Sequence, residues 1–210
     1  MKKLSIVICI LGLFFSTLSK ADLISLDDPD LGVDAITLDT TTGFNWLDIS
    51  FTLGQSYNQV LAETVNPDST LFGWSIATIG QVIGLTESVG LGDGFVGNSA
   101  EANDGFWTLA NSLGLSYSRG DYYGITALTS SPSIIDPTER YAFFNIRNYL
   151  GNVTVSDSSI FDGHWTGDQS YPIHAIWTVK TSSSVPEPST LLLLAVGLIG
   201  VGATRLRKMP

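Results

Sequence analysis

Acidic side chains recur early in the chain at a spacing that could bind a metal ion. Asp28, Asp30 and Asp34 form a D-x-D-x-G-x-D string, and Ca²⁺ prefers several oxygen ligands of this kind. An EF-hand loop has glycine at its sixth position and glutamate at its twelfth, whereas this string has glycine at its fifth position and lacks the glutamate. The string therefore predicts a solvated acidic loop, with calcium binding as the alternative.

A second set of candidate ligands lies in a long loop between residues 157 and 171. Its side chains could stack on a sugar ring and bond its hydroxyl groups, and the set consists of Asp162, His164, Trp165 and Asp168. Long loops of compact domains often carry binding surfaces. The alternative is that Trp165 folds back into the core and leaves the loop without a ligand.

No stretch of the chain indicates a reaction. A G-x-S-x-G elbow, an H-E-x-x-H zinc motif and a glycine-rich phosphate loop are absent, and the only cysteine is Cys9. His164 and His174 have no neighbouring His or Cys ligand. Many carboxylate pairs could in principle hydrolyse a glycoside, so none stands out. The sequence predicts a non-enzymatic protein without a cofactor, and a secreted carbohydrate-active enzyme is the alternative.

Acidic residues dominate the chain between positions 22 and 185. This part carries 19 acidic side chains against four basic ones, a formal balance of −15. Nucleic-acid binding needs clustered Lys and Arg, so that class of function is excluded. Such a charge could attract Ca²⁺ or repel an anionic polysaccharide. About 160 residues suffice for one core, and we expect a single domain over residues 22–180.

Three short helices are predicted to position the candidate residues. Two begin at capping boxes, Ser56–Gln59 and Thr78–Gln81, in which each terminal side chain bonds the backbone N–H of the other. The first ends at Asn66-Pro67 and the second at Gly90. The third, over residues 100–113, places its apolar residues on one face.

Strand-like segments account for the rest of the domain. Ala35–Leu38 and Phe44–Ile49 flank turn residues and predict a hairpin. In the second half, polar loops separate three further segments, Tyr122–Thr129, Tyr141–Arg147 and Asn152–Ser156. Helices and strands together predict an α+β domain with an antiparallel sheet.

The N-terminal end has the composition of a targeting segment. Lys2 and Lys3 precede an apolar run from Leu4 to Leu18, and small residues lead up to Ala21. This order predicts a secretory signal peptide over residues 1–21.

The C-terminal end, residues 185–208, has three parts. A Ser/Thr linker at 181–184 leads to the motif Pro186-Glu187-Pro188, which is followed by an apolar run and then by a basic cluster of Arg205, Arg207 and Lys208. We expect a transmembrane helix over residues 191–204. Its length of about 20 Å approaches the ~30 Å hydrocarbon core when flanking residues and snorkelling Arg side chains are added. The basic cluster would stop transfer and stay cytoplasmic.

This order of motif, apolar run and basic tail resembles the PEP-CTERM sorting signal of proteins exported by Gram-negative bacteria. In that family the motif is recognised by exosortase, a membrane protease-transpeptidase, and cleavage is expected beside it. The resemblance implies an exported protein that is held briefly in the inner membrane and then reaches the cell surface or the extracellular matrix. Exopolysaccharide of a biofilm is the expected partner there. A permanently tail-anchored periplasmic protein is the alternative.

A second resemblance covers residues 35–85 and the final strand. The D-x-x-x-G-x-x-W string that ends at Trp46, a short helix and the G-W-x-x-A-T string that begins at Gly73 resemble the opening of C-type-lectin-like domains of the formylglycine-generating-enzyme type. In that fold the first hairpin pairs with the final strand, here His174–Val179. The calcium- and sugar-binding tripeptides of C-type lectins and the cysteine pair of the formylglycine enzymes are absent. The resemblance therefore implies a fold and leaves activity open.

Overall fold

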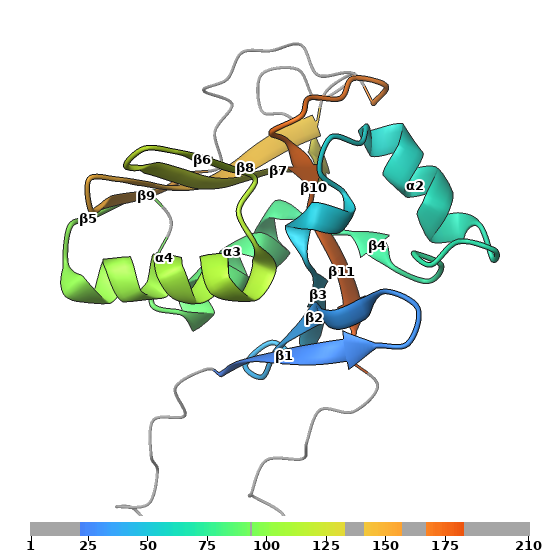
Figure 1. The fold of residues 1–210 in the computed structure, drawn as a ribbon, viewed down its shortest axis with the longest axis horizontal. Coiled ribbons are helices and arrows are strands. Elements are labelled where there is room, and N and C mark those ends of the chain that lie inside the picture. The colour runs from blue at the N-terminus through green and yellow to red at the C-terminus, as the bar shows by residue number, and fades with distance from the viewer. Residues whose placement is uncertain (1–21, 93, 133–140, 157–166, 183–210) are drawn as a thin grey trace, which may run out of the picture.

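Two β-sheets and three α-helices make up the described part of the chain (Figure 1). The computed structural model describes residues 22–92, 94–132, 141–156 and 167–182. The predicted α+β class with largely antiparallel sheets is confirmed. The predicted signal peptide, the sorting signal and the membrane helix at 191–204 lie outside these residues. Within the described ranges, no helix has both the length and the apolar character that crossing a membrane requires.

The first sheet, sheet A, contains both ends of the described chain and has the strand order β1-β2-β3-β11-β4. Its strands are β1 (Leu23–Asp28), β2 (Gly32–Asp39), β3 (Phe44–Leu47), β4 (Ser75–Ile76) and β11 (Thr178–Thr181). Leu23 pairs with Asp39, Asp39 with Phe44, and Phe44 with Thr181. The start of β1 and the end of β11 therefore lie in one row across the sheet. The predicted pairing of the first hairpin with the final strand is confirmed.

The second sheet, sheet B, has the order β10-β7-β8-β9-β5, and β6 also pairs with β7. Its strands are β5 (Gly94–Gly97), β6 (Tyr117–Arg119), β7 (Tyr122–Pro132), β8 (Tyr141–Tyr149), β9 (Asn152–Ser156) and β10 (Ala175–Ile176). β6 pairs antiparallel with the first half of β7, whereas β10 pairs parallel with Ala127 and Leu128 further along it. β6 and β10 thus share one edge of β7.

The helices begin where the sequence predicts. They are α2 (Tyr57–Val65), α3 (Ile79–Ser88) and α4 (Ala100–Leu113), and a 3₁₀ turn, η1, spans Ile49–Phe51. Both capping boxes form: the Gln59 backbone N–H donates to the Ser56 hydroxyl at 3.2 Å, and the Thr78 backbone N–H donates to the Gln81 side chain at 2.8 Å. Because these bonds are local, the sequence alone predicts where the two helices begin.

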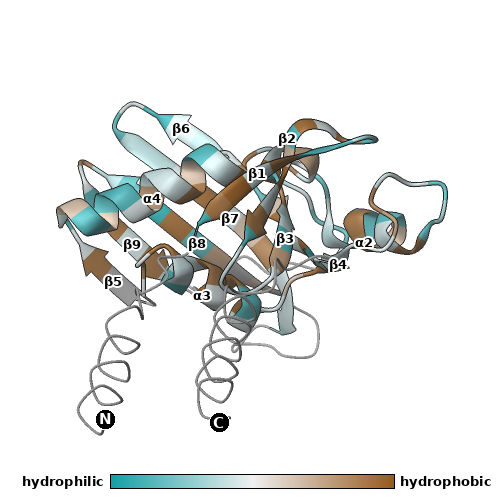
Figure 2. Ribbon diagram, turned by 90° about the horizontal axis from the view of Figure 1, so that it is seen from below, coloured by the Kyte–Doolittle hydropathy of each residue, from teal (hydrophilic) through white to brown (hydrophobic). Residues whose placement is uncertain are grey.

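The main core lies between sheet B and two helices. α3 and α4 lie against one face of sheet B, as Figures 1 and 2 both show. Ile125, Phe144 and Ile146 from sheet B are fully buried there with Phe106 and Leu109 of α4. The ring of Trp46 in β3 contacts that of Trp177 edge to face at 6.0 Å, which ties sheet A to this core.

A second core lies beside α2. Val60 of α2 packs there with Trp74, Ile76, Leu128 and Ile176, so β4, β7 and β10 all contribute to it. The short segment that contains β10 and β11 contributes side chains to both cores, and its two strands belong to different sheets.

Four details differ from the sequence prediction. β1 occupies a stretch that predicted no strand, because its residues LISLDD pair with β2 although only Leu23, Leu26 and Asp28 are even half-buried. β5 and β6 were likewise not predicted. The final strand is divided into β10 and β11, because the chain leaves β7 at Trp177 and joins sheet A from Thr178 onward, beside β4 and then β3.

Candidate functional site

The acidic string of the first hairpin forms a turn. Asp28 ends β1, and its Oδ1 accepts the backbone N–H groups of Asp30 at 2.9 Å and of Leu31 at 3.1 Å. Asp34 lies in β2 with φ 53°, and its backbone N–H donates to Oδ1 of Asp27 at 3.0 Å. Among the described residues, no three His, Cys, Asp or Glu side chains gather in a way that could hold a metal ion. The structure therefore does not assemble the three aspartates as a ligand set, and the Asp28 carboxylate stabilises the turn.

Only one member of the predicted ligand loop falls within the described residues. Asp162, His164 and Trp165 lie outside them, whereas Asp168 is exposed beside the start of α2. The Asn58 side chain donates to Asp168 Oδ1 at 2.8 Å, and the Asn58 backbone N–H donates to the Gly167 carbonyl at 2.8 Å. The structure thus gives Asp168 a positioning contact with α2.

The sorting residues also lie outside the described part of the chain. They comprise the motif Pro186, Glu187 and Pro188 and the basic cluster Arg205, Arg207 and Lys208. The last described backbone contact before them is the bond from the Ser182 N–H to the Gly43 carbonyl at 3.0 Å.

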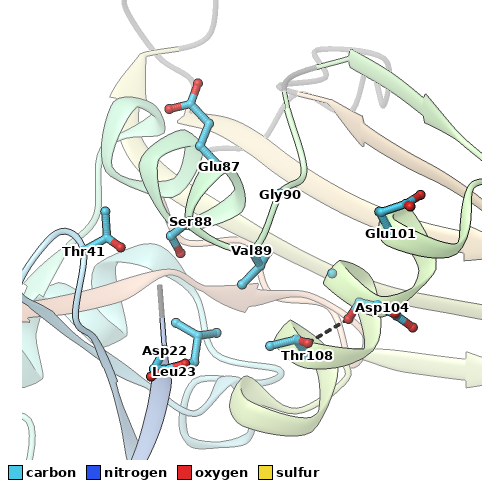
Figure 3. A pocket seen from close by; sticks show the side chains of 11 residues that line it. Asp22, Leu23, Thr41, Glu87, Ser88, Val89, Gly90, Glu101, Asp104 and Thr108 are labelled. Atoms are coloured by element: carbon cyan, nitrogen blue, oxygen red, sulfur yellow. Dashed lines mark hydrogen bonds between the residues drawn. The ribbon is translucent and has the colours of Figure 1, made fainter. Parts of the chain in front are cut away.

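A pocket of about 670 Å³ lies between the start of β1, the end of α3 and the first half of α4 (Figure 3). We call it the acidic pocket, because Asp22, Glu87, Glu101 and Asp104 line it. Figure 3 shows the side chains of Glu87, Glu101 and Asp104 pointing to different sides rather than to a common centre. The carboxylates of the acidic pocket therefore do not converge on one point.

A pocket of about 450 Å³ lies in sheet B where β6 and β10 share the edge of β7. We call it the tyrosine–arginine pocket. Its main lining residues are Tyr117, Arg119, Tyr122, Arg147, Ile173 and His174. Its volume falls in the range of small-ligand pockets, roughly 300–1,000 Å³.

The strand register explains how these side chains meet. Tyr117 of β6 pairs with Gly124 of β7, and Gly124 pairs with Arg147 of β8, so the three residues form one row. The neighbouring row consists of Arg119, Tyr122 and Tyr149. Alternate residues of a strand share a face, so both rows lie on the face opposite to that of Ile125 and Ile146. Sheet B therefore packs one face on the helices and presents tyrosine and arginine on the other.

Gly124 lets the Tyr117 ring lie flat across this face. A Cβ atom at position 124 would come within 2.2 Å of the ring carbon that carries the hydroxyl group of Tyr117. The Tyr117 ring also stacks on Tyr122, with centroids 5.4 Å apart and an interplanar angle of 28°. Tyr122 contacts Tyr149 edge to face at 5.6 Å. Three aromatic rings thus support one another around the two arginines.

Burial and neighbouring charge set the protonation of the pocket. Burial, with the positive charge of Arg147 as the smaller second cause, lowers the pKa of His174 to about 4. Burial, together with a hydrogen bond to Tyr122, raises the pKa of the Tyr117 hydroxyl above its usual value of 10. At neutral pH, His174 and Tyr117 are both uncharged and the two guanidinium groups carry the positive charge.

This pocket was not predicted from the sequence, although β7 carries a local signal for it. Polar and apolar residues alternate in β7, where Tyr122, Gly124 and Thr126 alternate with Ile125 and Ala127. This alternation predicts a strand with one functional face. The convergence of Tyr117 with Arg147 depends on cross-strand register, which the sequence alone does not specify.

Comparison with known proteins gives one match. Residues 184–208 match the PEP-CTERM protein-sorting motif. No curated protein and no solved structure matches the chain. The match supports the prediction that this chain is exported and processed at the membrane by an exosortase, with a cell-surface or extracellular destination.

Proposed function

We propose that this chain is a non-enzymatic carbohydrate-binding protein of the cell surface or extracellular matrix of a Gram-negative bacterium, where it binds exopolysaccharide of a biofilm. The sorting motif at residues 184–208 supports export and release by exosortase. The tyrosine–arginine pocket carries the proposal of binding, because it combines aromatic faces with hydrogen-bond donors in an open hollow of suitable volume.

The lining of the pocket favours binding over catalysis. Glycoside hydrolysis ordinarily needs two carboxyl groups that flank the scissile bond. None of the described residues that line the tyrosine–arginine pocket is acidic. In the acidic pocket, the carboxylates in Figure 3 point apart. A carbohydrate-active enzyme is therefore the weaker of the two functions.

A C-type-lectin-like fold is part of the proposal. Its support is the position of β11, which lies between β3 and β4 and so joins the final strand to the first hairpin. The two short capped helices α2 and α3 flank β4 in the expected order. An experimental structure whose strand order departs from that of sheet A would remove this support.

Intact mass spectrometry of the chain from its host's medium and membranes tests export and release. We expect a released species that starts at Asp22 and ends near Pro186 to Pro188. A species that retains residues 191–210 in the membrane fraction, with none released, would instead establish a permanently tail-anchored periplasmic protein.

Co-sedimentation with the host's extracellular polysaccharide tests binding. We expect the full chain to sediment with the polymer and Tyr122→Ala to lose most of this association, because Tyr122 contributes ring contacts in the pocket. Phe72→Ala is the matched control, since Phe72 is an aromatic residue that is 52% exposed outside the pocket. Equal loss in both variants, or no sedimentation of the wild type, would reject carbohydrate binding at this site. The chain length of the polymer should stay constant during incubation, and its shortening would indicate an enzyme.

A further inference from the structure

Tyr149 extends the aromatic surface beyond the tyrosine–arginine pocket. It lies on β8 in the row of Arg119 and Tyr122, but it is not one of the residues that line the pocket. Its ring contacts that of Tyr122 edge to face at 5.6 Å, and its side chain is 53% exposed. The surface of Tyr149 is therefore continuous with the pocket and open to solvent.

The backbone that carries Tyr149 is fixed on both sides. Tyr149 pairs with Tyr122 of β7 and with Asn152 of β9. The turn that follows has φ 50° at Leu150, whose backbone N–H donates to the Asp121 carbonyl at 3.3 Å. This bond joins the β8–β9 turn to the β6–β7 turn. Tyrosine has few rotatable bonds, so a ring on such a frame can bind a ligand at a low cost in conformational entropy.

The surface from the pocket to Tyr149 is longer than one sugar ring. Thr126 and Tyr122 both line the pocket, and their separation along β7 is about 14 Å at 3.4 Å per residue. Tyr149 lies one strand further across, at a spacing of about 4.8 Å. A sugar ring built from bonds of about 1.5 Å is about 3 Å across, and its link to the next ring adds about 2 Å. The surface from Thr126 to Tyr149 thus has the length of about three linked units.

The contact between the two rings allows two roles for Tyr149. In the first role it only supports the Tyr122 ring, and its loss would then weaken ligands of every length alike. In the second role it contacts the ligand itself, and its loss would then weaken only ligands long enough to reach it. The exposure of the ring favours the second role, because a ring that only supports its neighbour gains nothing from an open face.

We propose that Tyr149 forms an outer subsite, so that the site binds a segment of about three linked sugar units that leaves the pocket across Tyr122 and Tyr149. This inference rests on the proposed carbohydrate-binding function and names its ligand class, a polysaccharide segment rather than a free sugar. The inner units lie along β7 between Thr126 and Tyr122, and the outer unit lies against the exposed ring. Because this ring is open to solvent, the polymer can continue past it.

Binding of fragments of the host's extracellular polysaccharide to the full chain, in mild detergent, tests the inference. The probes are the disaccharide, trisaccharide and tetrasaccharide fractions of the partially hydrolysed polymer, with affinities measured by isothermal titration calorimetry. We expect the trisaccharide to bind about threefold to tenfold more tightly than the disaccharide, as one added aromatic contact implies. The tetrasaccharide should gain less than about twofold more. A disaccharide that binds as tightly as the trisaccharide would overturn the outer subsite.

Variants distinguish a subsite from a support. Tyr149→Ala should weaken trisaccharide binding about threefold to tenfold and disaccharide binding less than about twofold, whereas Tyr149→Phe, which keeps the ring, should retain most of the affinity. Phe72→Ala is the matched control, since Phe72 is 52% exposed outside the pocket, and it should change neither affinity. Equal weakening of both probes by Tyr149→Ala would show that the ring only supports Tyr122, and the inference would be wrong.

The outcomes also separate this inference from the proposed function. If the disaccharide and the trisaccharide bind equally well and Tyr149→Ala changes neither affinity, the outer subsite is wrong while carbohydrate binding stands. If neither the fragments nor the intact polymer binds, both the inference and the proposed function fail.

Discussion

Two pockets in the described part of the domain, the acidic pocket and the tyrosine–arginine pocket, contrast in how they use charge. The acidic pocket is larger, about 670 Å³ against about 450 Å³, and is lined by four carboxylates. Asp22 directly precedes β1, and the carboxylates of Glu87 in α3 and of Glu101 and Asp104 in α4 point apart in Figure 3. The tyrosine–arginine pocket has two cations, but neighbouring rows of one sheet hold them beside stacked rings. The comparison teaches that convergence of side chains, rather than their number, indicates a binding site.

Local structure accounts for one acid of the larger pocket. Glu101 lies in the first turn of α4, where its own backbone N–H and the Ser99 hydroxyl lower the pKa of its carboxyl group. An acid at a helix N-terminus also complements the helix dipole. Glu101 therefore contributes to the cap of α4. Arg147, in the tyrosine–arginine pocket, lies within strand β8 and has no part in a helix cap.

The acidic pocket contains a glycine under close contact, Gly105, and its substitution gives the largest expected effect. A Cβ atom on Gly105 would lie 2.7 Å from the Val89 carbonyl oxygen and 3.0 Å from Leu91 Cγ. Because a backbone group and a buried Leu cannot move aside easily, Gly105→Ala should lower the free energy of unfolding by about 1–3 kcal/mol. Urea denaturation measures this. Gly80→Ala, with nothing within 4 Å of the added Cβ, is the control, and equal midpoints for the two variants would refute close packing of α4 here.

Gly124→Ala should act mainly on binding. The added Cβ would meet the far end of the Tyr117 side chain, which can swing out, so we expect little loss of stability. The displaced ring should weaken binding to the host's extracellular polysaccharide about threefold to tenfold, as for the loss of one aromatic contact. Co-sedimentation of the variant with the polymer measures this. Unchanged affinity would show that Tyr117 takes no part in the site.

A smaller effect is expected on the pH dependence of stability. The pKa of His174 in the folded chain is about 4, below its usual 6.5, so protonation favours the unfolded state. This contribution is complete above pH 6.5 and is lost as the pH falls from 6.5 towards 4. Because His174 is only half-buried, solvent screening should keep it to about 1 kcal/mol or less. His174→Gln should flatten the stability profile over this range relative to wild type, and parallel profiles would contradict the assignment.

The smallest effect is expected from calcium. Because the carboxylates of the hairpin and of the acidic pocket do not converge, 1 mM Ca²⁺ should shift the unfolding midpoint by less than about 1 °C. Thermal unfolding with Ca²⁺ and with EDTA measures the shift. A rise of several degrees would mean that the acidic side binds a cation, and it would reverse the contrast between the pockets.

Elements governed by nearby residues could be predicted from the sequence. Both capping boxes and the strand Asn152–Ser156 follow from short-range patterns and appear as predicted. β1 could not be predicted, because none of its side chains is fully buried and its sequence LISLDD therefore shows no apolar face.

The site was harder to predict than the elements. Tyr117 and Arg147 are far apart in sequence and meet only because β6, β7 and β8 are paired in one register. The loop residues singled out from composition, Asp162, His164 and Trp165, lie outside the described residues, so that hypothesis remains a prediction.

The row that joins Leu23 to Thr181 has a consequence for orientation during export. Three strand spacings separate the two ends, about 14 Å, so both lead away from the same border of sheet A. In Figure 1 this border lies at the bottom, and β6, β7 and β8 lie at the top. If the predicted tail helix holds the protein in the membrane, this arrangement would turn the pocket away from the bilayer. A cut beyond Ser182 leaves every described strand pairing intact, so the proposed ligand would be bound before and after release, and cleavage would change only how far the protein can diffuse.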